Sequence, residues 1–229
     1  MIVAIHQPNY IPWLGFFYKI AKSDIFIFLD DVQYTKNSFI NRNKIKTSQG
    51  SIWLTLPVRN KGRFGQLIRE VELNESVPWR KKHIKTLEAN YSRSIYFLKY
   101  YDSIKNLYDI SNGSLSILNI TFIKYICAEL GIKTKFINAS EMKISGTSTN
   151  RLVDICMQLG ADTYFSGFGG SKYQEEEIFN KYGIKLQYSD FIHPVYTQLW
   201  GEFIPNLSIF DLLFNCGERS LEILLKENN

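Results

Sequence analysis

The sequence contains few cysteines and no run of hydrophobic residues long enough to cross a membrane. The three cysteines, Cys127, Cys156 and Cys216, are far apart in the chain and have apolar neighbours. No CxxC motif and no Cys/His metal spacing is present, so we expect reduced core cysteines, a cytoplasmic protein and no metal site. The N-terminus also lacks the basic and apolar regions that are typical of a secretory signal peptide.

Charge is modest as well, with a net value of +5 over 229 residues. The densest basic patch consists of residues 80–83 (RKKH) together with Lys85. A solvated helix face is the simpler interpretation of this patch, so we expect no DNA binding and a mild preference for small anionic ligands. Hydrophobic residues make up 45% of the chain, which is enough for one full core.

Residues 1–34 predict a strand, a loop, a helix and a second strand. Ile2–Ile5 is a short apolar run, and Pro8 and Pro12 keep the residues that follow it out of regular pairing. Residues 13–21 have the aromatic and aliphatic face of a helix. Ile25–Leu29 is continuously apolar, as expected of a strand that is buried on both faces.

Polar residues follow both of these strands. They are His6 and Gln7 after the first strand, and Asp30, Asp31, Gln33 and Tyr34 after the second. Because ligands bind outside the carboxyl ends of the strands in an open parallel sheet, we predict a site at this edge, with Tyr10 and Trp13 lining it. In the alternative interpretation, these residues simply end strands in ordinary loops.

The middle of the chain has a different pattern. Residues 38–73 show short alternating runs, with a turn at residues 48–50 between predicted strands at 39–46 and 52–58, and another predicted strand at 67–73. Residues 78–109 predict one or two helices. We therefore expect an inserted β and helical subdomain at about residues 38–112 within a single α/β domain of residues 1–229.

Strands and helices alternate again after Gly113. Predicted helices start at Ser114, at Ser148 or Thr149, at Tyr173 and at Ser208, and predicted strands cover 133–139, 163–165 and 184–188. Alternation with short links favours a parallel sheet with right-handed crossovers. The expected fold class is α/β: a Rossmann-like three-layer fold with a mainly parallel sheet, an antiparallel β addition and further helices. In the last helix, Asp211 is expected to be structural.

A second candidate binding segment lies between the strand at 163–165 and the following helix. Its residues are Ser166, Gly167, Gly169, Gly170, Ser171 and Tyr173, and the glycines would let backbone approach a ligand closely. Free N–H groups at the start of a helix suit an anion such as phosphate. The segment is neither a Walker loop nor GxGxxG. The alternative is a tight turn that requires positive φ.

Two further candidates complete the predicted binding residues. Asn41 and Arg42 lie on the predicted hairpin, where Arg42 could grip a carboxylate or phosphate, or could simply be exposed on a strand. His193 follows the last predicted strand and is the weaker candidate of the two.

Four segments carry a resemblance to a known family. HQPNYIPWLGFFYKI, the DDVQY and NRNKI runs, YFSGFGGSKY, and HPVYTQ with FIPNLSIFDLLFNCG together resemble the WbqC-like family. The resemblance extends over nearly the whole chain. It implies a role in bacterial O-antigen and other surface-polysaccharide clusters, in making or decorating unusual sugars.

The first βαβ unit also resembles pantothenate synthetase and other HIGH-type nucleotidyltransferases. The departure is that His6 has no second signature histidine, and Phe16 and Phe17 follow Gly15 where a polar residue would be wanted.

Two functional hypotheses follow from the residues and the resemblance. In the first, the protein transfers or ligates an acyl or aminoacyl group to a nucleotide-linked amino sugar, with His6 as acid or base and Asp30 or Asp31 orienting it. ATP with Mg²⁺ is one candidate co-substrate. In the second, the chain is a non-catalytic sugar-nucleotide-binding partner in glycan assembly. A HIGH-like nucleotidyltransferase is a third possibility.

Overall fold

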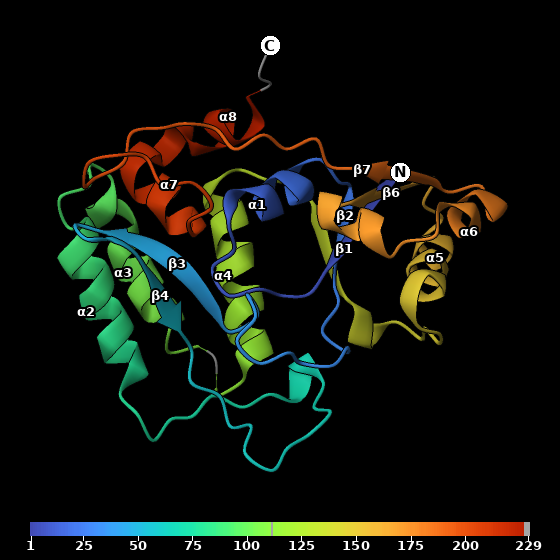
Figure 1. The fold of residues 1–229 in the computed structure, drawn as a ribbon, viewed down its shortest axis with the longest axis horizontal. Coiled ribbons are helices and arrows are strands. Elements are labelled where there is room, and N and C mark those ends of the chain that lie inside the picture. Colours follow the sequence, from blue (N-terminus) through green and yellow to red (C-terminus); the bar gives the residue numbers. More distant parts are fainter. Residues whose placement is uncertain (111, 227–229) are drawn as a thin grey trace.

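A five-stranded parallel sheet forms the centre of the computed structural model, which describes residues 1–110 and 112–226 (Figure 1). Its strands are β1 (Ile2–His6), β2 (Ile25–Phe28), β5 (Lys135–Asn138), β6 (Thr163–Ser166) and β7 (Lys185–Tyr188). The spatial order is β5-β2-β1-β6-β7, which is the doubly wound Rossmann order. The predicted α/β fold class is confirmed, and the predicted neighbours β1 and β2 pair from Val3–Ile25 to His6–Phe28.

Helices cover both faces of this sheet. On one face, Val3 and Ile5 of β1 belong to a core cluster with residues of α5 (Ser148–Leu159) and α6 (Glu176–Lys181). On the other face, Ala4 and the β2 residue Phe26 belong to a larger cluster with α1 (Leu14–Ala21) and α4 (Leu115–Glu129). Helices α7 (Ile209–Cys216) and α8 (Ser220–Leu225) extend that cluster. The side-chain alternation of the strands therefore produces the predicted three layers.

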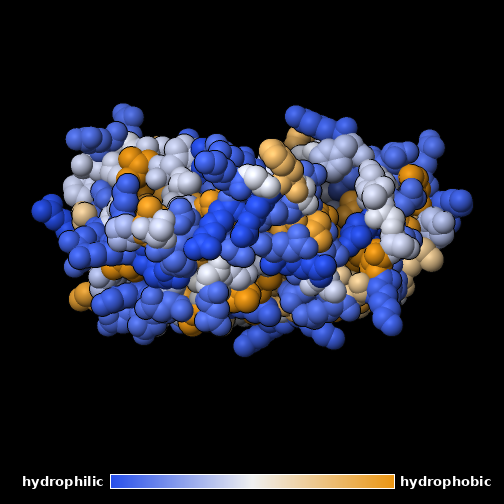
Figure 2. Space-filling view, turned by 90° about the horizontal axis from the view of Figure 1, so that it is seen from below, coloured by the Kyte–Doolittle hydropathy of each residue, from blue (hydrophilic) through white to orange (hydrophobic). Residues whose placement is uncertain are grey.

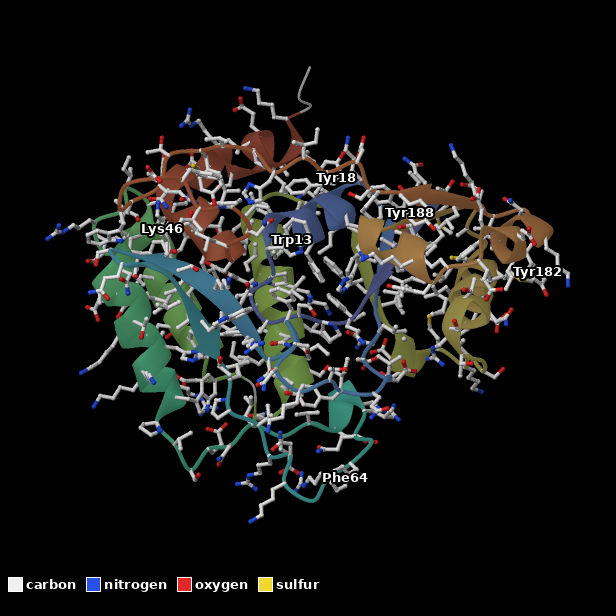
Figure 3. All side chains as sticks on the ribbon, viewed as in Figure 1. Trp13, Tyr18, Lys46, Phe64, Tyr182 and Tyr188 are labelled. Atoms are coloured by element: carbon white, nitrogen blue, oxygen red, sulfur yellow. The ribbon has the colours of Figure 1, made fainter. Side chains whose placement is uncertain are left out.

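A small antiparallel sheet and two helices lie between β2 and α4 in the chain. They are β3 (Arg42–Thr47), β4 (Gly50–Thr55), α2 (Trp79–Tyr91) and α3 (Phe97–Leu107). The loop after β4 carries Phe64, which is 96% exposed at the lower edge of the view in Figure 3. Ile45 and Leu54 belong to the same core cluster as the α1 and α4 residues, so this insertion shares its core with the parallel sheet.

The strand predicted at residues 67–73 is wrong. A 3-10 helix at Ile68–Glu70 replaces it, with isolated bridges at Leu67 and Leu73. The Glu70 carboxylate accepts a hydrogen bond from the Leu67 N–H, which closes a local turn in place of a strand ladder. The buried residues Ile68 and Val71 are three apart, which suits one side of such a turn better than strand alternation.

Helix ends show where the sequence signals were sufficient. Ser114 caps α4 by accepting a hydrogen bond from the Ile117 N–H, and α5 ends at Gly160 in the left-handed conformation, as predicted. The cap of α5 is Thr147, one residue before the predicted Ser148 or Thr149. The helix predicted from Tyr173 begins only at Glu176 of α6, after a 3-10 helix at Phe168–Lys172.

The exterior carries no single dominant hydrophobic area on the face shown in Figure 2, where hydrophobic residues are scattered among hydrophilic ones. All three cysteines are free and buried, as predicted. Within residues 1–110 and 112–226, no helix is long and apolar enough to cross a membrane.

Asp211 fastens three segments together in the core. Its carboxylate is fully buried and accepts hydrogen bonds from the hydroxyls of Tyr91 and Tyr196, each at 2.9 Å. Asp211→Ala leaves both hydroxyls without this acceptor, so we expect a loss of about 3–5 kcal/mol in unfolding free energy, measured by urea denaturation. The exposed Asp154→Ala on α5 is the control and should change it by less than about 0.5 kcal/mol. Equal effects of the two variants would contradict a structural role for Asp211.

Candidate functional site

Two adjoining cavities lie at the carboxyl ends of β1 and β6, where the strand order of the parallel sheet reverses. Doubly wound folds bind ligands at this position. The first, which we call the helix cavity, has a volume of about 290 Å³ and lies against the start of α5; its wall includes Ser148, Thr149, Arg151 and Leu152. The second, the glycine cavity, has a volume of about 410 Å³; its wall includes Trp13, Lys19, Ser166, Gly167, Gly169, Gly170 and Phe191. Ile5, His6, Tyr164, Tyr173 and Gln174 line both.

His6 lies in the shared wall as the last residue of β1. Its Nδ1 is 2.9 Å from the carbonyl of Gln7, and because a carbonyl only accepts, Nδ1 carries the proton. Burial is the main cause that lowers the pKa of His6 to about 3, and the nearby Lys19 charge lowers it further. His6 is therefore neutral near pH 7, and its Nε2 lone pair has no hydrogen-bond partner in the part of the chain that the structure describes.

Lys19 is the functional candidate that the sequence interpretation missed. It lies on α1, is 3% exposed, and donates a hydrogen bond from Nζ to the carbonyl of Ile5 at 3.1 Å. Burial lowers its pKa to about 7. Across residues 1–110 and 112–226, no carboxylate forms an ion pair with it. The sequence signal for a buried lysine was its place within the apolar run LGFFYKIA, because a helix that is apolar on nearly every side leaves the lysine no solvated face.

The glycine turn does not have the positive φ values of the alternative interpretation. Gly167 has φ −68°, and neither Gly169 nor Gly170 is in the left-handed region, so positive φ does not explain these glycines. Close packing explains one of them. A Cβ on Gly170 would lie 2.5 Å from Ser166 Oγ, whereas a Cβ on Gly169 would meet nothing within 4 Å.

This difference gives a paired prediction. Gly170→Ala should displace Ser166 and Gln174 from the wall of the glycine cavity, lowering the melting temperature by a few degrees and weakening ligand binding about tenfold or more. Gly169→Ala should leave both properties nearly unchanged. Thermal melts with and without a sugar nucleotide measure the two variants. Equal behaviour of the pair would show that close packing at Gly170 is not what the turn requires.

The two predicted carboxylates are engaged with protein partners. Asp30 accepts hydrogen bonds from the backbone N–H and the hydroxyl of Ser140, at 3.0 and 2.7 Å, and so fastens the end of β2 to the turn after β5. Asp31 forms an ion pair with Arg151, with both side chains about 15% exposed. Neither carboxylate lines the cavities, but Asp31 orients Arg151, which does.

Of the other predicted site residues, the structure brings Gln7, Trp13, Ser166, Gly167, Gly169, Gly170 and Tyr173 to the cavities beside His6. Trp13 lies beside α1 (Figure 3) and fits there because Gly15 has no side chain: a Cβ on Gly15 would lie 2.4 Å from the indole. Tyr173 is 68% exposed at the rim.

The remaining predicted residues lie elsewhere. Ser171 bonds to the carbonyl of Phe168, and Gln33 is exposed and bridged to Leu67. Burial raises the pKa of Tyr34 to about 12. Asn41 is buried and donates to the carbonyl of Leu56, and the Arg42 guanidinium lies 4.3 Å from the Trp53 ring centre.

Tyr10 and His193 have core contacts in place of the predicted pocket contacts. The Tyr10 hydroxyl is fully buried and bonds to His83 Nδ1 and to the Tyr108 hydroxyl. His193 Nε2 accepts a hydrogen bond from the Asn206 N–H. This bond fixes the segment between β7 and α7, residues 189–208, which we call the C-terminal arm. From that arm, Phe191 lines the glycine cavity.

Buried asparagines hold the loop between β1 and α1. Asn119 donates hydrogen bonds to the carbonyls of Pro8 and Ile40, and Asn43 donates to the carbonyl of Ile11 at 2.8 Å. Ile11 has φ 35°, a strained value for a β-branched residue. The surroundings of this loop therefore fix its shape before any ligand binds.

The described residues, 1–110 and 112–226, contain no group of three His, Cys, Asp or Glu side chains that could hold a metal ion.

The comparison with known proteins agrees with the motifs around the cavities. A family model described as the WbqC-like protein family matches residues 7–223, which include the lining residues of both cavities from Gln7 onward, whereas Ile5 and His6 lie just before the matched range. The chain belongs to the WbqC-like family. It is also 43% identical over 224 residues to the uncharacterized protein Rv1507c of Mycobacterium tuberculosis (strain ATCC 25618 / H37Rv), covering 97% of this WbqC-like chain and 96% of that protein. No solved structure matches.

Two histidines, the partly buried His6 and the buried His83, make the stability of this WbqC-like protein depend on pH. Burial is the main cause that lowers the pKa of His6 to about 3 and that of His83 to about 4. The unfolded chain takes up these protons near pH 6.5, so unfolding free energy should fall as the pH falls from about 6.5 towards 4. Urea denaturation across this range measures the effect, and His83→Gln should reduce the slope. A wild-type profile that is flat below pH 6.5 would contradict the burial of both imidazoles.

Proposed function

We propose that this WbqC-like protein is a cytoplasmic enzyme of bacterial surface-polysaccharide (O-antigen) biosynthesis that joins an acyl or aminoacyl group to the amine of a nucleotide-linked amino sugar. The observation that carries this proposal is the position of His6. His6 lines both cavities, its Nε2 has no hydrogen-bond partner among the described residues, and Lys19 lines one of the two cavities. Such an arrangement suits a reaction in which two substrates meet at a proton acceptor.

The glycine cavity suits the nucleotide-linked sugar. Lys19 is buried without a carboxylate partner among the described residues, so an anionic group would stabilise its charged form. The adjacent 166–170 turn brings backbone close to the same space. At the rim, Phe168 and Tyr173 are 74% and 68% exposed and offer surfaces on which a base or a sugar ring can stack.

The helix cavity suits the acyl or aminoacyl donor. Ile5, Leu29 and Leu152 give it an apolar wall, and Arg151 offers a guanidinium at its edge. If the group is activated by ATP with Mg²⁺, the phosphates of ATP would meet the guanidinium of Arg151.

In the reaction, the sugar amine attacks the acyl carbonyl, a C–N bond forms, and the bond to the leaving group breaks. The proton lost by the amine passes to His6 Nε2 and then to the leaving group. A pKa near 3 would make His6 a weak base in the empty cavity. An anionic substrate beside the imidazole raises that pKa, so His6 becomes a competent base when the cavity is occupied.

The alternative is a non-catalytic sugar-nucleotide-binding partner in glycan assembly, and the low pKa of His6 is the observation that favours it. Mass spectrometry of the purified protein incubated with nucleotide-linked amino sugars, acyl or aminoacyl donors and ATP separates the two. A product heavier than the sugar nucleotide by the acyl residue supports the enzyme. Tight binding of the sugar nucleotide with no product under any donor condition would favour the binding partner.

A further inference from the structure

A third cavity, which we call the Trp cavity, lies between β4 and the start of α2. Its volume is about 510 Å³, and its lining includes Trp53, Thr55, Pro78, Trp79, Lys82 and His83. It shares no lining residue with the helix or glycine cavities. The Trp cavity belongs to the inserted segment, and the function proposed above does not use it.

The backbone of β4 offers a free hydrogen-bonding pair to this cavity. The Leu56 N–H donates to the carbonyl of Asn41, so in the antiparallel register Trp53 and Thr55 turn their N–H and C=O groups away from β3. The Thr55 carbonyl accepts a hydrogen bond from His83 Nε2 at 3.2 Å. The N–H and C=O of Trp53 have no partner among the residues that the structure describes.

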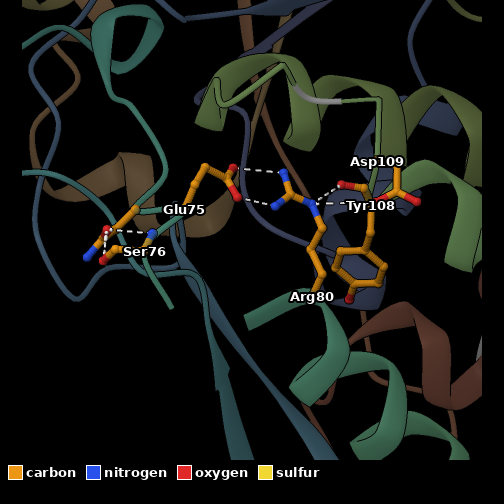
Figure 4. Close-up of polar contacts among 6 residues, drawn as sticks. Glu75, Ser76, Arg80, Tyr108 and Asp109 are labelled. Atoms are coloured by element: carbon orange, nitrogen blue, oxygen red, sulfur yellow. Dashed lines mark hydrogen bonds and ion pairs between the residues drawn. The ribbon is translucent and has the colours of Figure 1, made fainter. Parts of the chain in front are cut away.

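The side chains around this pair are flat and basic. Trp53 is 40% exposed, whereas Trp79, which also lines the cavity, is only 4% exposed. Lys82 also lines the cavity, Lys44 Nζ lies 5.1 Å from the Trp53 ring centre, and none of the described lining residues is acidic. Arg80, next to Trp79, is engaged with Glu75, Asp109 and the carbonyl of Tyr108 (Figure 4).

The geometry decides between three kinds of ligand. A peptide strand needs several consecutive outward-facing pairs, but His83 already occupies Thr55. The trans amide of an N-acylated sugar points its N–H and C=O in opposite directions, so it can satisfy only one group of Trp53. A nucleobase carries an adjacent donor and acceptor in one plane, and its two faces stack on aromatic side chains.

We propose that the Trp cavity is a nucleotide-binding site, in which the base edge bonds to the Trp53 backbone, the ring lies against the exposed part of the Trp53 indole, and the phosphate meets Lys82 and Lys44. This site is separate from the His6 cavities and does not rest on the activity proposed for them.

The test uses the full-length protein carrying Lys19→Met, so that binding in the glycine cavity does not contribute. Calorimetry with AMP, UMP, GMP and CMP should give at least one Kd of about 1 mM or tighter. Ribose 5-phosphate and N-acetylglucosamine should bind at least about tenfold more weakly. Trp53→Ala should weaken the nucleotide about tenfold or more, with the melting temperature nearly unchanged because this side chain is partly exposed.

A separate variant tests the contribution of the Lys82 charge to phosphate binding. Lys82→Met should remove the advantage of each nucleotide over its nucleoside, and the neighbouring exposed Lys81→Met is the matched control. The proposal is overturned if no mononucleotide binds, if N-acetylglucosamine binds as tightly as a nucleotide, or if Trp53→Ala and Lys82→Met bind like their parent.

Discussion

Lys19→Met is expected to stabilise the protein and to weaken strongly the binding of anionic ligands in the glycine cavity. The buried amine has a pKa lowered to about 7, and among residues 1–110 and 112–226 only the Ile5 carbonyl accepts a hydrogen bond from it, so the folded chain holds a poorly compensated charge near neutral pH. A methionine of similar length removes this charge, and unfolding free energy should rise by about 2 kcal/mol. Affinity for a sugar nucleotide should fall by about 100-fold, because the cation of the cavity is lost.

Urea denaturation and calorimetry measure the two effects on one preparation. Lys22→Met, at the C-cap of the same helix, is the matched control, since Lys22 is exposed, and it should change unfolding free energy by less than about 0.5 kcal/mol and leave affinity unchanged. Opposite signs for stability and binding identify a residue kept for function. A Lys19→Met protein that is less stable and binds normally would show that the amine serves the fold alone.

His6→Ala is expected to lower turnover by about 10²–10⁴-fold while the melting temperature stays within a few degrees of the parent. In the proposed reaction the imidazole accepts the proton of the sugar amine, and its loss leaves that proton without a base. His6→Gln, which retains a hydrogen-bonding side chain but has no basic nitrogen, should be nearly as slow. Steady-state rates at saturating substrate measure both variants.

The control for this variant is His193→Ala. His193 is partly buried and fixes the C-terminal arm through Asn206. His193→Ala should therefore lower the melting temperature while turnover stays close to that of the parent. Full activity in His6→Ala would place catalysis elsewhere. Loss of stability without a specific rate defect would make His6 a core residue.

The parallel sheet was predictable because its signal is local. Ile25–Leu29 is apolar at every position, which suits a strand with helices on both faces, and Gly160 marks a helix end because few other residues adopt its left-handed conformation. The strand predicted at residues 67–73 was wrong because the local signal there is ambiguous. Their apolar spacing fits both a strand and a turn, and the Glu70 side chain decides between them.

The position of the site could be predicted from the sequence, but not the full set of residues that line it. The strand ends His6 and Ser166 could be placed at one edge from topology alone. The partners of Asp30 and Asp31 could not, since Ser140 and Arg151 are 110 and 120 residues away in sequence and meet them only through packing. The same limit applies to Tyr10, whose hydroxyl finds His83 in the core.

The most direct test of the anion site beside His6 is proton uptake on binding. Calorimetric titration of the protein at about pH 8 with a nucleoside-diphosphate sugar that lacks a free amine, in two buffers of different ionisation enthalpy, counts the protons. With a pKa of about 7, Lys19 is mostly neutral at that pH, and a bound diphosphate should protonate it, giving an uptake of up to about 0.9 proton per site that vanishes in Lys19→Met. Measurable binding with no proton uptake in the wild-type protein would contradict the proposed site.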